Sequence, residues 1–60
     1  MSFEIKYFVE QIRTYLMADL AIRNESNLFD IAVNLIKRHD PTHFEHICQA
    51  YEVVKHELIG

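Results

Sequence analysis

The 60-residue chain is poor in the residues that interrupt regular structure or cross-link it. It has one cysteine, one proline and one glycine, and the glycine is the last residue. A single cysteine cannot form a disulfide within the chain, so we expect a fold that needs none and a reducing, cytoplasmic compartment. Because there is no internal glycine, the glycine-rich loop that cradles phosphate groups in many nucleotide-binding proteins is absent.

Long apolar runs and an excess of basic residues are also missing. The longest apolar-rich stretch, 15–22, is interrupted by Asp19, and it is shorter than the roughly 20 residues that a membrane span needs. No basic region precedes an apolar segment at the N-terminus, so no signal peptide is predicted. Nine acidic residues against six basic ones give a net charge of −3, whereas proteins that bind nucleic acid usually show a basic excess or patch. We therefore expect neither a membrane protein nor a nucleic-acid-binding protein.

Half of the residues are apolar, and their spacing predicts one all-α domain over residues 1–60. Three helices are expected, at about 3–23, 27–38 and 41–58. Ser2 can cap the first helix, because its hydroxyl can accept a hydrogen bond from an unpaired backbone N–H. The apolar residues of this helix recur at three- and four-residue steps and form one stripe: Ile5, Phe8, Val9, Ile12, Leu16 and Leu20.

The second helix follows a polar break in which Asn24 or Ser26 can serve as the cap. One face of it is apolar and is expected to join the core: Leu28, Ile31, Ala32 and Leu35.

The third helix has the clearest start signal in the chain. Asp40 places a capping carboxylate before Pro41, whose missing N–H costs nothing at the first helical position. Thr42 with Glu45 offers an alternative capping box two residues later. A narrow apolar stripe follows, which is typical of a helix that faces one partner helix: Phe44, Ile47, Tyr51, Val54 and Leu58.

The segment 2–8 also fits a strand, because polar and apolar residues alternate from Ser2 to Tyr7. Such a strand would have to pair with its copy across a dimer axis, since no second strand is predicted. We expect the helix, and an N-terminal strand followed by helices is the alternative.

The first helix carries more apolar surface than the other two helices can cover. The large side chains left over form the predicted interaction surface: Phe3, Tyr7, Phe8, Tyr15 and Met17. Burying one of them is worth roughly 1.5–3 kcal/mol, so two or three rival the stability of a small domain, about 5–15 kcal/mol. We therefore expect a homodimer through this helix, and tyrosines at its edge suit binding of a second protein. The alternative is that these side chains are ordinary core.

Three histidines and the cysteine lie within ten residues of one another. Among them His43 and His46, three residues apart, are the candidate ligands for a metal ion such as zinc. His39, however, precedes the break at Asp40, and the spacing with Cys48 matches no zinc-finger or metalloprotease pattern. We predict no metal site and no cofactor.

Cys48, Glu52 and His56 follow one another at four-residue steps and could suggest a nucleophile with its base. A nucleophile also needs a pocket and an oxyanion site. A chain of this size with one glycine offers little for either, so we predict no enzyme activity.

Lys37, Arg38 and His39 form the one basic cluster, and they allow a degenerate helix-turn-helix over 28–58. The helix that would read DNA has no lysine or arginine before Lys55, so phosphate contacts would be few. A transcriptional regulator is therefore the alternative prediction.

The chain resembles the very small, acidic, helical accessory proteins that lambda-like temperate bacteriophages make early in infection. The features that carry the resemblance are the single compact unit, the lack of a catalytic set and the aromatic-rich opening Phe3, Glu4, Ile5, Lys6, Tyr7 and Phe8. Such proteins are often dimeric and bind host or phage proteins to bias lytic or lysogenic development. No functional residue carries over from them. The resemblance implies a non-enzymatic, homodimeric accessory protein that binds and modulates another protein.

Overall fold

Helices make up the fold of the computed structural model, which describes residues 2–18 and 25–59, and no strand occurs in these ranges. The elements, in chain order, are α1 (Phe3–Ala18), α2 (Glu25–Arg38), the 3₁₀ turn η1 (Pro41–His43) and α3 (Phe44–Ile59). The predicted all-α, three-helix unit is confirmed.

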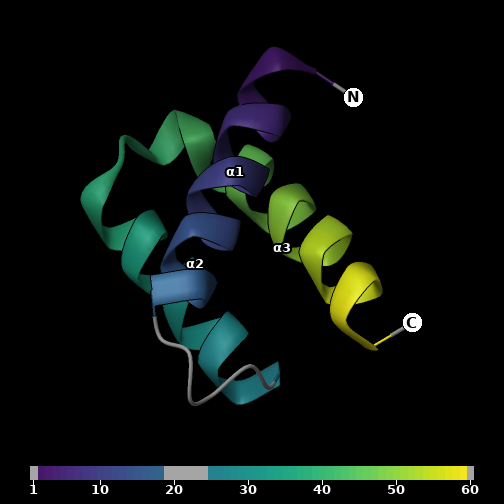
Figure 1. Ribbon diagram of the computed structural model, residues 1–60. Coiled ribbons are helices and arrows are strands. Elements are labelled where there is room, and N and C mark those ends of the chain that lie inside the picture. The colour runs from purple at the N-terminus through teal and green to yellow at the C-terminus, as the bar shows by residue number, and fades with distance from the viewer. Residues whose placement is uncertain (1, 19–24, 60) are drawn as a thin grey trace.

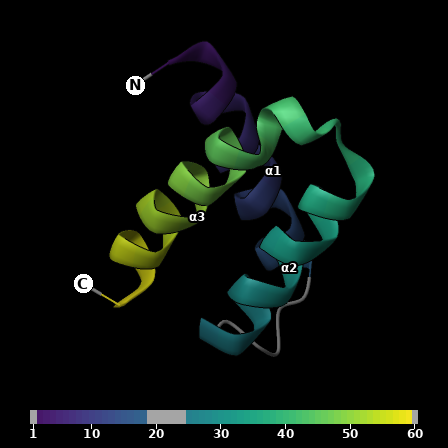
Figure 2. The ribbon, with the colours of Figure 1, turned by 180° about the vertical axis from the view of Figure 1, so that it is seen from behind.

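The three helices are arranged so that α1 contacts both of the others. In Figure 1, α1 lies in front of α2 and α3, and the view from behind in Figure 2 places α2 and α3 in front of it. α2 and α3 also contact each other. One side of α1 therefore packs on the other two helices, and its opposite side faces away from them.

The start of α1 follows the capping rule. The backbone N–H of Ile5 donates a hydrogen bond to Oγ of Ser2 at 3.2 Å, and the N–H of Lys6 donates to the Ser2 carbonyl at 3.0 Å. The alternative strand over 2–8 is wrong, because the helix begins at Phe3. The predicted end of the helix at residue 23 lies outside the described residues.

α2 begins at Glu25, two residues earlier than predicted. The backbone of Ser26 therefore lies inside the helix, and Asn24 lies outside the described residues.

Asp40 caps the third helical segment, as predicted. Its Oδ1 accepts a hydrogen bond from the Thr42 N–H at 2.9 Å, and Pro41 occupies the first turn. This turn is a 3₁₀ turn, so α3 itself begins at Phe44 rather than at residue 41. Asp40, rather than Thr42 with Glu45, is the cap. The hydrogen bonds from Thr42 hold the pKa of the Asp40 carboxyl below its ordinary value.

The core is a single apolar cluster to which all three helices contribute. Its members are Ile5, Phe8, Val9, Ile12, Leu16, Leu28, Ala32, Leu35, Ile47, Ala50 and Val54. Across the described residues, every buried side chain is apolar. Chemistry that needs polar groups must therefore occur at the surface of this part of the molecule.

The predicted narrow stripe of α3 needs a correction. Phe44 is 48% exposed, whereas Ala50, which lies outside that stripe, is fully buried. The described buried residues of α3 are Ile47, Ala50 and Val54, and their three- and four-residue steps turn the buried face toward Ala50 and away from Phe44.

Among the helices described, none is both long enough and apolar enough to cross a membrane.

Candidate interaction surface

The outer face of α1, which points away from α2 and α3, exposes large apolar side chains. We define this face by Phe3, Lys6, Tyr7, Glu10, Thr14 and Met17, which recur on one side of the helix at mainly three- and four-residue steps. Phe3 is 81% exposed, Met17 is 64% exposed and Tyr7 is 47% exposed. Three of the five residues of the predicted interaction surface thus share one exposed face.

A shallow hollow occupies the N-terminal half of the outer face. Phe3, Lys6, Tyr7 and Glu10 line it, and its volume is about 340 Å³. The aromatic rings make the hollow apolar, and Lys6 and Glu10 supply one charge of each sign. Sequence reasoning did not identify this hollow, because helical periodicity shows which residues share a face but not whether a depression lies between them.

Phe8 does not belong to the exposed surface, and its inclusion there was wrong. Its side chain is 2% exposed and lies in the core. The connection after α2 brings two imidazoles onto the ring, with centroids 5.0 Å from His39 and 5.5 Å from His43. These residues lie more than thirty positions away in the chain, so the pattern of α1 alone could not show that they cover Phe8.

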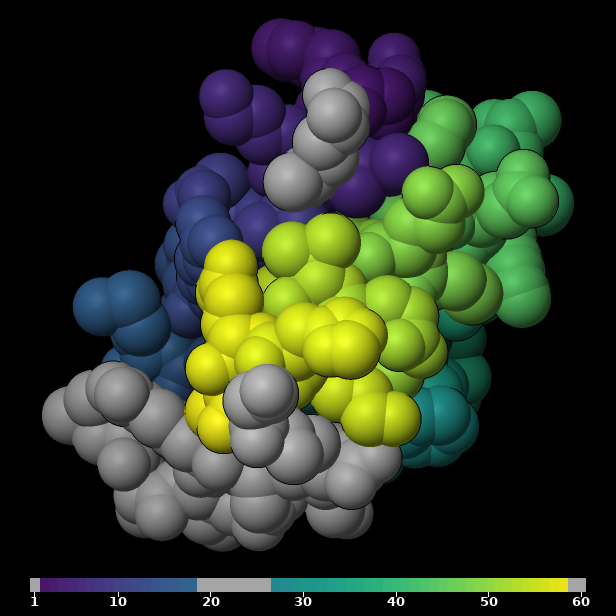
Figure 3. All heavy atoms as spheres, turned by 90° about the vertical axis from the view of Figure 1, so that its right-hand side faces the viewer, coloured from purple at the N-terminus to yellow at the C-terminus, as the bar shows by residue number. Residues whose placement is uncertain are grey.

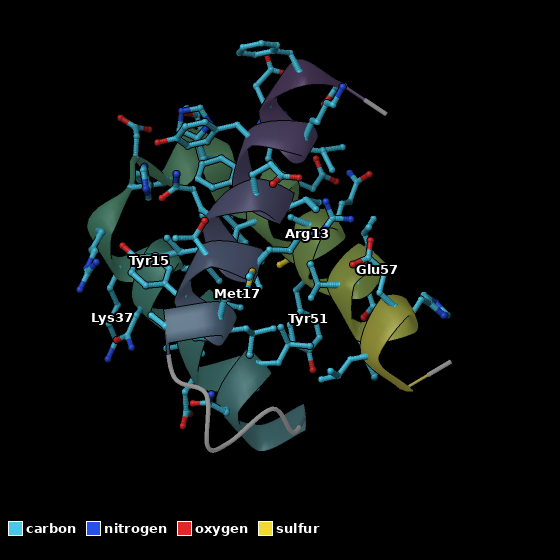
Figure 4. All side chains as sticks on the ribbon, viewed as in Figure 1. Arg13, Tyr15, Met17, Lys37, Tyr51 and Glu57 are labelled. Atoms are coloured by element: carbon cyan, nitrogen blue, oxygen red, sulfur yellow. The ribbon has the colours of Figure 1, made fainter. Side chains whose placement is uncertain are left out.

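Tyr15 lies on a different side of α1 from Phe3, Tyr7 and Met17. It is 39% exposed, and its hydroxyl accepts a hydrogen bond from Nη1 of Arg38 at 3.1 Å. The Arg38 guanidinium also lies 5.9 Å from the centroid of the tyrosine ring, within the range of a cation–π contact. Tyr15 therefore takes part in the contact between α1 and α2, and Figure 4 shows it beside α2.

One arginine links the edge of the outer face to α3. Arg13 donates to Glu57 twice, from Nε to Oε2 at 3.2 Å and from Nη2 to Oε1, and it also donates to Glu10. Figure 4 shows Arg13 and Glu57 pointing toward each other from the two helices. The hydrogen bond to Arg13 lowers the pKa of Glu57, and the bond to Glu57 is the main reason that the pKa of Arg13 is raised.

The space-filling view in Figure 3 shows α1 along the upper left edge of the molecule, next to α3. A second hollow lies between these two helices, about 260 Å³ in volume, and Met17 is one of its lining residues together with Arg13, Leu16, Val54, Glu57 and Leu58. Met17 therefore reaches the border between the outer face of α1 and the edge of α3.

A further apolar groove runs between α2 and α3, and sequence reasoning did not identify it as a surface. Its lining residues are Phe29, Ala32, Val33, Ile36, Cys48, Tyr51 and Glu52, and its volume is about 280 Å³. Phe29 is 56% exposed and meets Tyr51 edge to face, with ring centroids 6.1 Å apart. The only sequence signal was the position of Phe29 beside the core face of its helix.

The two candidate metal ligands are close together. Nδ1 of His43 lies 3.3 Å from Nδ1 of His46, and both side chains are half-buried. The two nitrogens are within hydrogen-bond distance, and which of them donates depends on the tautomers of the two rings. No group of three or more potential ligands gathers within residues 2–18 and 25–59.

Of the three candidate catalytic residues, Cys48 and Glu52 line one groove and His56 does not. Cys48 is half-buried and lines the groove between α2 and α3, whereas His56 is exposed on α3. The prediction that the chain is not an enzyme stays a prediction.

Two residues of the basic cluster contact other side chains of the same chain. Arg38 contacts Tyr15, and the ring of His39 packs against Phe8, while Lys37 is exposed. A helix-turn-helix regulator also stays a prediction, and two of the three residues on which it depends have partners within the chain.

No protein-family model, no curated protein and no solved structure matches this chain.

Proposed function

We propose that this chain is a non-enzymatic, cytoplasmic interaction module, a small homodimeric accessory protein that binds another protein and modulates its activity. The main support for the proposal is the exposure of three large side chains on α1, namely Phe3, Tyr7 and Met17. The opposite side of the same helix already supplies five residues of the core. None of these three side chains is a buried member of the described core, although the Tyr7 ring meets the Phe8 ring edge to face with centroids 5.1 Å apart. Exposed aromatic and methionine side chains are the types enriched in protein interfaces.

The cost of leaving this face in water favours a protein partner. Each large apolar side chain transferred from water into an interface contributes roughly 1.5–3 kcal/mol. Tyr7 is suited to the rim of such a contact, because its ring can be covered while its hydroxyl stays hydrated. A phage accessory protein, which the resemblance suggests, would act in this way.

Affinity capture from cell lysate tests the proposal when the wild-type chain is compared with a Phe3→Ser, Tyr7→Ser double variant. Both positions are exposed, so we expect the variant to keep the helical circular dichroism spectrum of the wild type. A protein recovered by the wild type should be lost from the double variant. Phe44→Ser is the matched control, because it removes an exposed aromatic side chain from α3 instead. Equal recovery by the double variant would contradict the proposal.

A further inference from the structure

We propose that the outer face of α1 is covered by α1 of a second copy running antiparallel, with Met17 of each copy seated in the hollow of the other. This inference rests on the proposed function, because it assigns the homodimer contact that this function includes to the outer face of α1. It fixes an orientation and a register, neither of which follows from the expectation of a dimer alone.

The shape of the hollow favours a helix as its occupant. Phe3, Lys6, Tyr7 and Glu10 stand at positions i, i+3, i+4 and i+7 of one helix. Four residues in this arrangement form the hole that receives a single side chain of a facing helix in knobs-into-holes packing.

Met17 is the side chain on the same face that fits the hollow. It is 64% exposed, and its unbranched, flexible thioether chain adapts to irregular apolar gaps. It cannot enter its own hollow, because ten residues separate it from Tyr7, about 15 Å along a helix that rises 1.5 Å per residue. A second copy can supply it.

An antiparallel arrangement fills both hollows at once. The two-fold axis of this pair lies between the two helices, perpendicular to both, and level with the midpoint between Glu10 and Thr14. It places Met17 of each copy opposite Tyr7 of the other. A parallel pair would instead place hollow against hollow and Met17 against Met17, so that neither hollow would be filled.

The charges beside the axis favour the same orientation. Glu10 and Arg13 form an ion pair within one copy, and their side chains are 61% and 41% exposed. Reversing one helix places Glu10 of each copy near Arg13 of the other, whereas a parallel pair places like charges together. Complementary charges of this kind fix register and orientation at interfaces.

Disulfide trapping tests the orientation directly. In a Cys48→Ser background, which removes the one natural cysteine, we would prepare a Tyr7→Cys chain and a Met17→Cys chain. Mild oxidation of the two chains mixed in equal amounts should give at least about tenfold more covalent dimer than oxidation of either chain alone, because a disulfide needs its two Cα atoms within about 7 Å. Both substituted positions are exposed, and circular dichroism would check that each chain is folded.

Two results would overturn the inference. Covalent dimers of equal yield from each single-cysteine chain alone would show a parallel pair. No covalent dimer from the mixture would show that no second copy lies on this face. In that second case, capture of a different protein by the same Cys48→Ser chain would leave the proposed binding of another protein standing without the dimer, whereas efficient trapping without any captured protein would contradict that binding and not the inference.

Discussion

Arg13 shows how a single exposed residue can connect two helices that are far apart in the sequence. It lies on α1 and reaches Glu57 near the end of α3, while Glu10 occupies another of its N–H groups. Both side chains of the Arg13–Glu57 pair are more than 40% exposed, so water and salt screen the attraction between them. We expect the pair to stabilise the contact between α1 and α3 only modestly.

We predict that the Arg13–Glu57 pair contributes less than about 1 kcal/mol to the free energy of unfolding at neutral pH. A double-mutant cycle with Arg13→Gln, Glu57→Gln and the double variant, measured by urea denaturation, gives this coupling energy. Because the pKa of Glu57 is lowered by folding, its contribution is fully present above the ordinary value of 4.5 and is lost as the pH falls through the lower folded value. Added salt should also reduce the coupling. A coupling that persists unchanged in acid or in high salt would contradict the assignment.

At the scale of the helix, the two faces of α1 have different roles although each carries a phenylalanine. Phe8 lies in the core beneath His39 and His43, and Phe3 is 81% exposed on the outer face. The sequence pattern placed Phe8 both in the core stripe and among the surplus side chains, and the structure resolves this in favour of the core.

Substitution of these two phenylalanines separates core from surface. Phe8→Ala should lower the free energy of unfolding by about 3–5 kcal/mol, because it leaves a cavity beneath the imidazoles. Phe3→Ala should change it by less than about 0.5 kcal/mol when unfolding is followed at a protein concentration low enough to keep the chain monomeric. The opposite ranking would show that Phe8, and not Phe3, belongs to a contact surface.

Element positions were largely predictable from the sequence because their signals are local. Ser2 and Asp40 both cap the helical segments that they were predicted to cap, and the buried residues of α1 are those of its apolar stripe. The exposure of Phe44 and the burial of Ala50 were not predictable, because the side of α3 that meets the core depends on how this helix docks on α1 and α2. The hollow at Phe3 and Tyr7 depends in the same way on three-dimensional side-chain positions rather than on periodicity.

At the scale of the whole molecule, one face stands out from an otherwise ordinary small helical domain. A folded chain of this size buries only about 60% of the surface that the unfolded chain exposes, so its stability as a monomer is marginal. The described core uses one side of α1 and leaves Phe3, Tyr7 and Met17 in contact with solvent. Covering that face in a dimer would add apolar burial that the single chain lacks.

Sedimentation equilibrium over a range of protein concentrations tests most directly whether the outer face of α1 is a contact surface. We expect the mass of the wild-type chain to rise from one chain to two as the concentration increases. A Met17→Glu variant, which places a carboxylate in the apolar hollow of the other copy, should stay at one chain, while Phe44→Ser should behave like the wild type. A wild-type chain that remains folded and monomeric at every concentration would contradict the account.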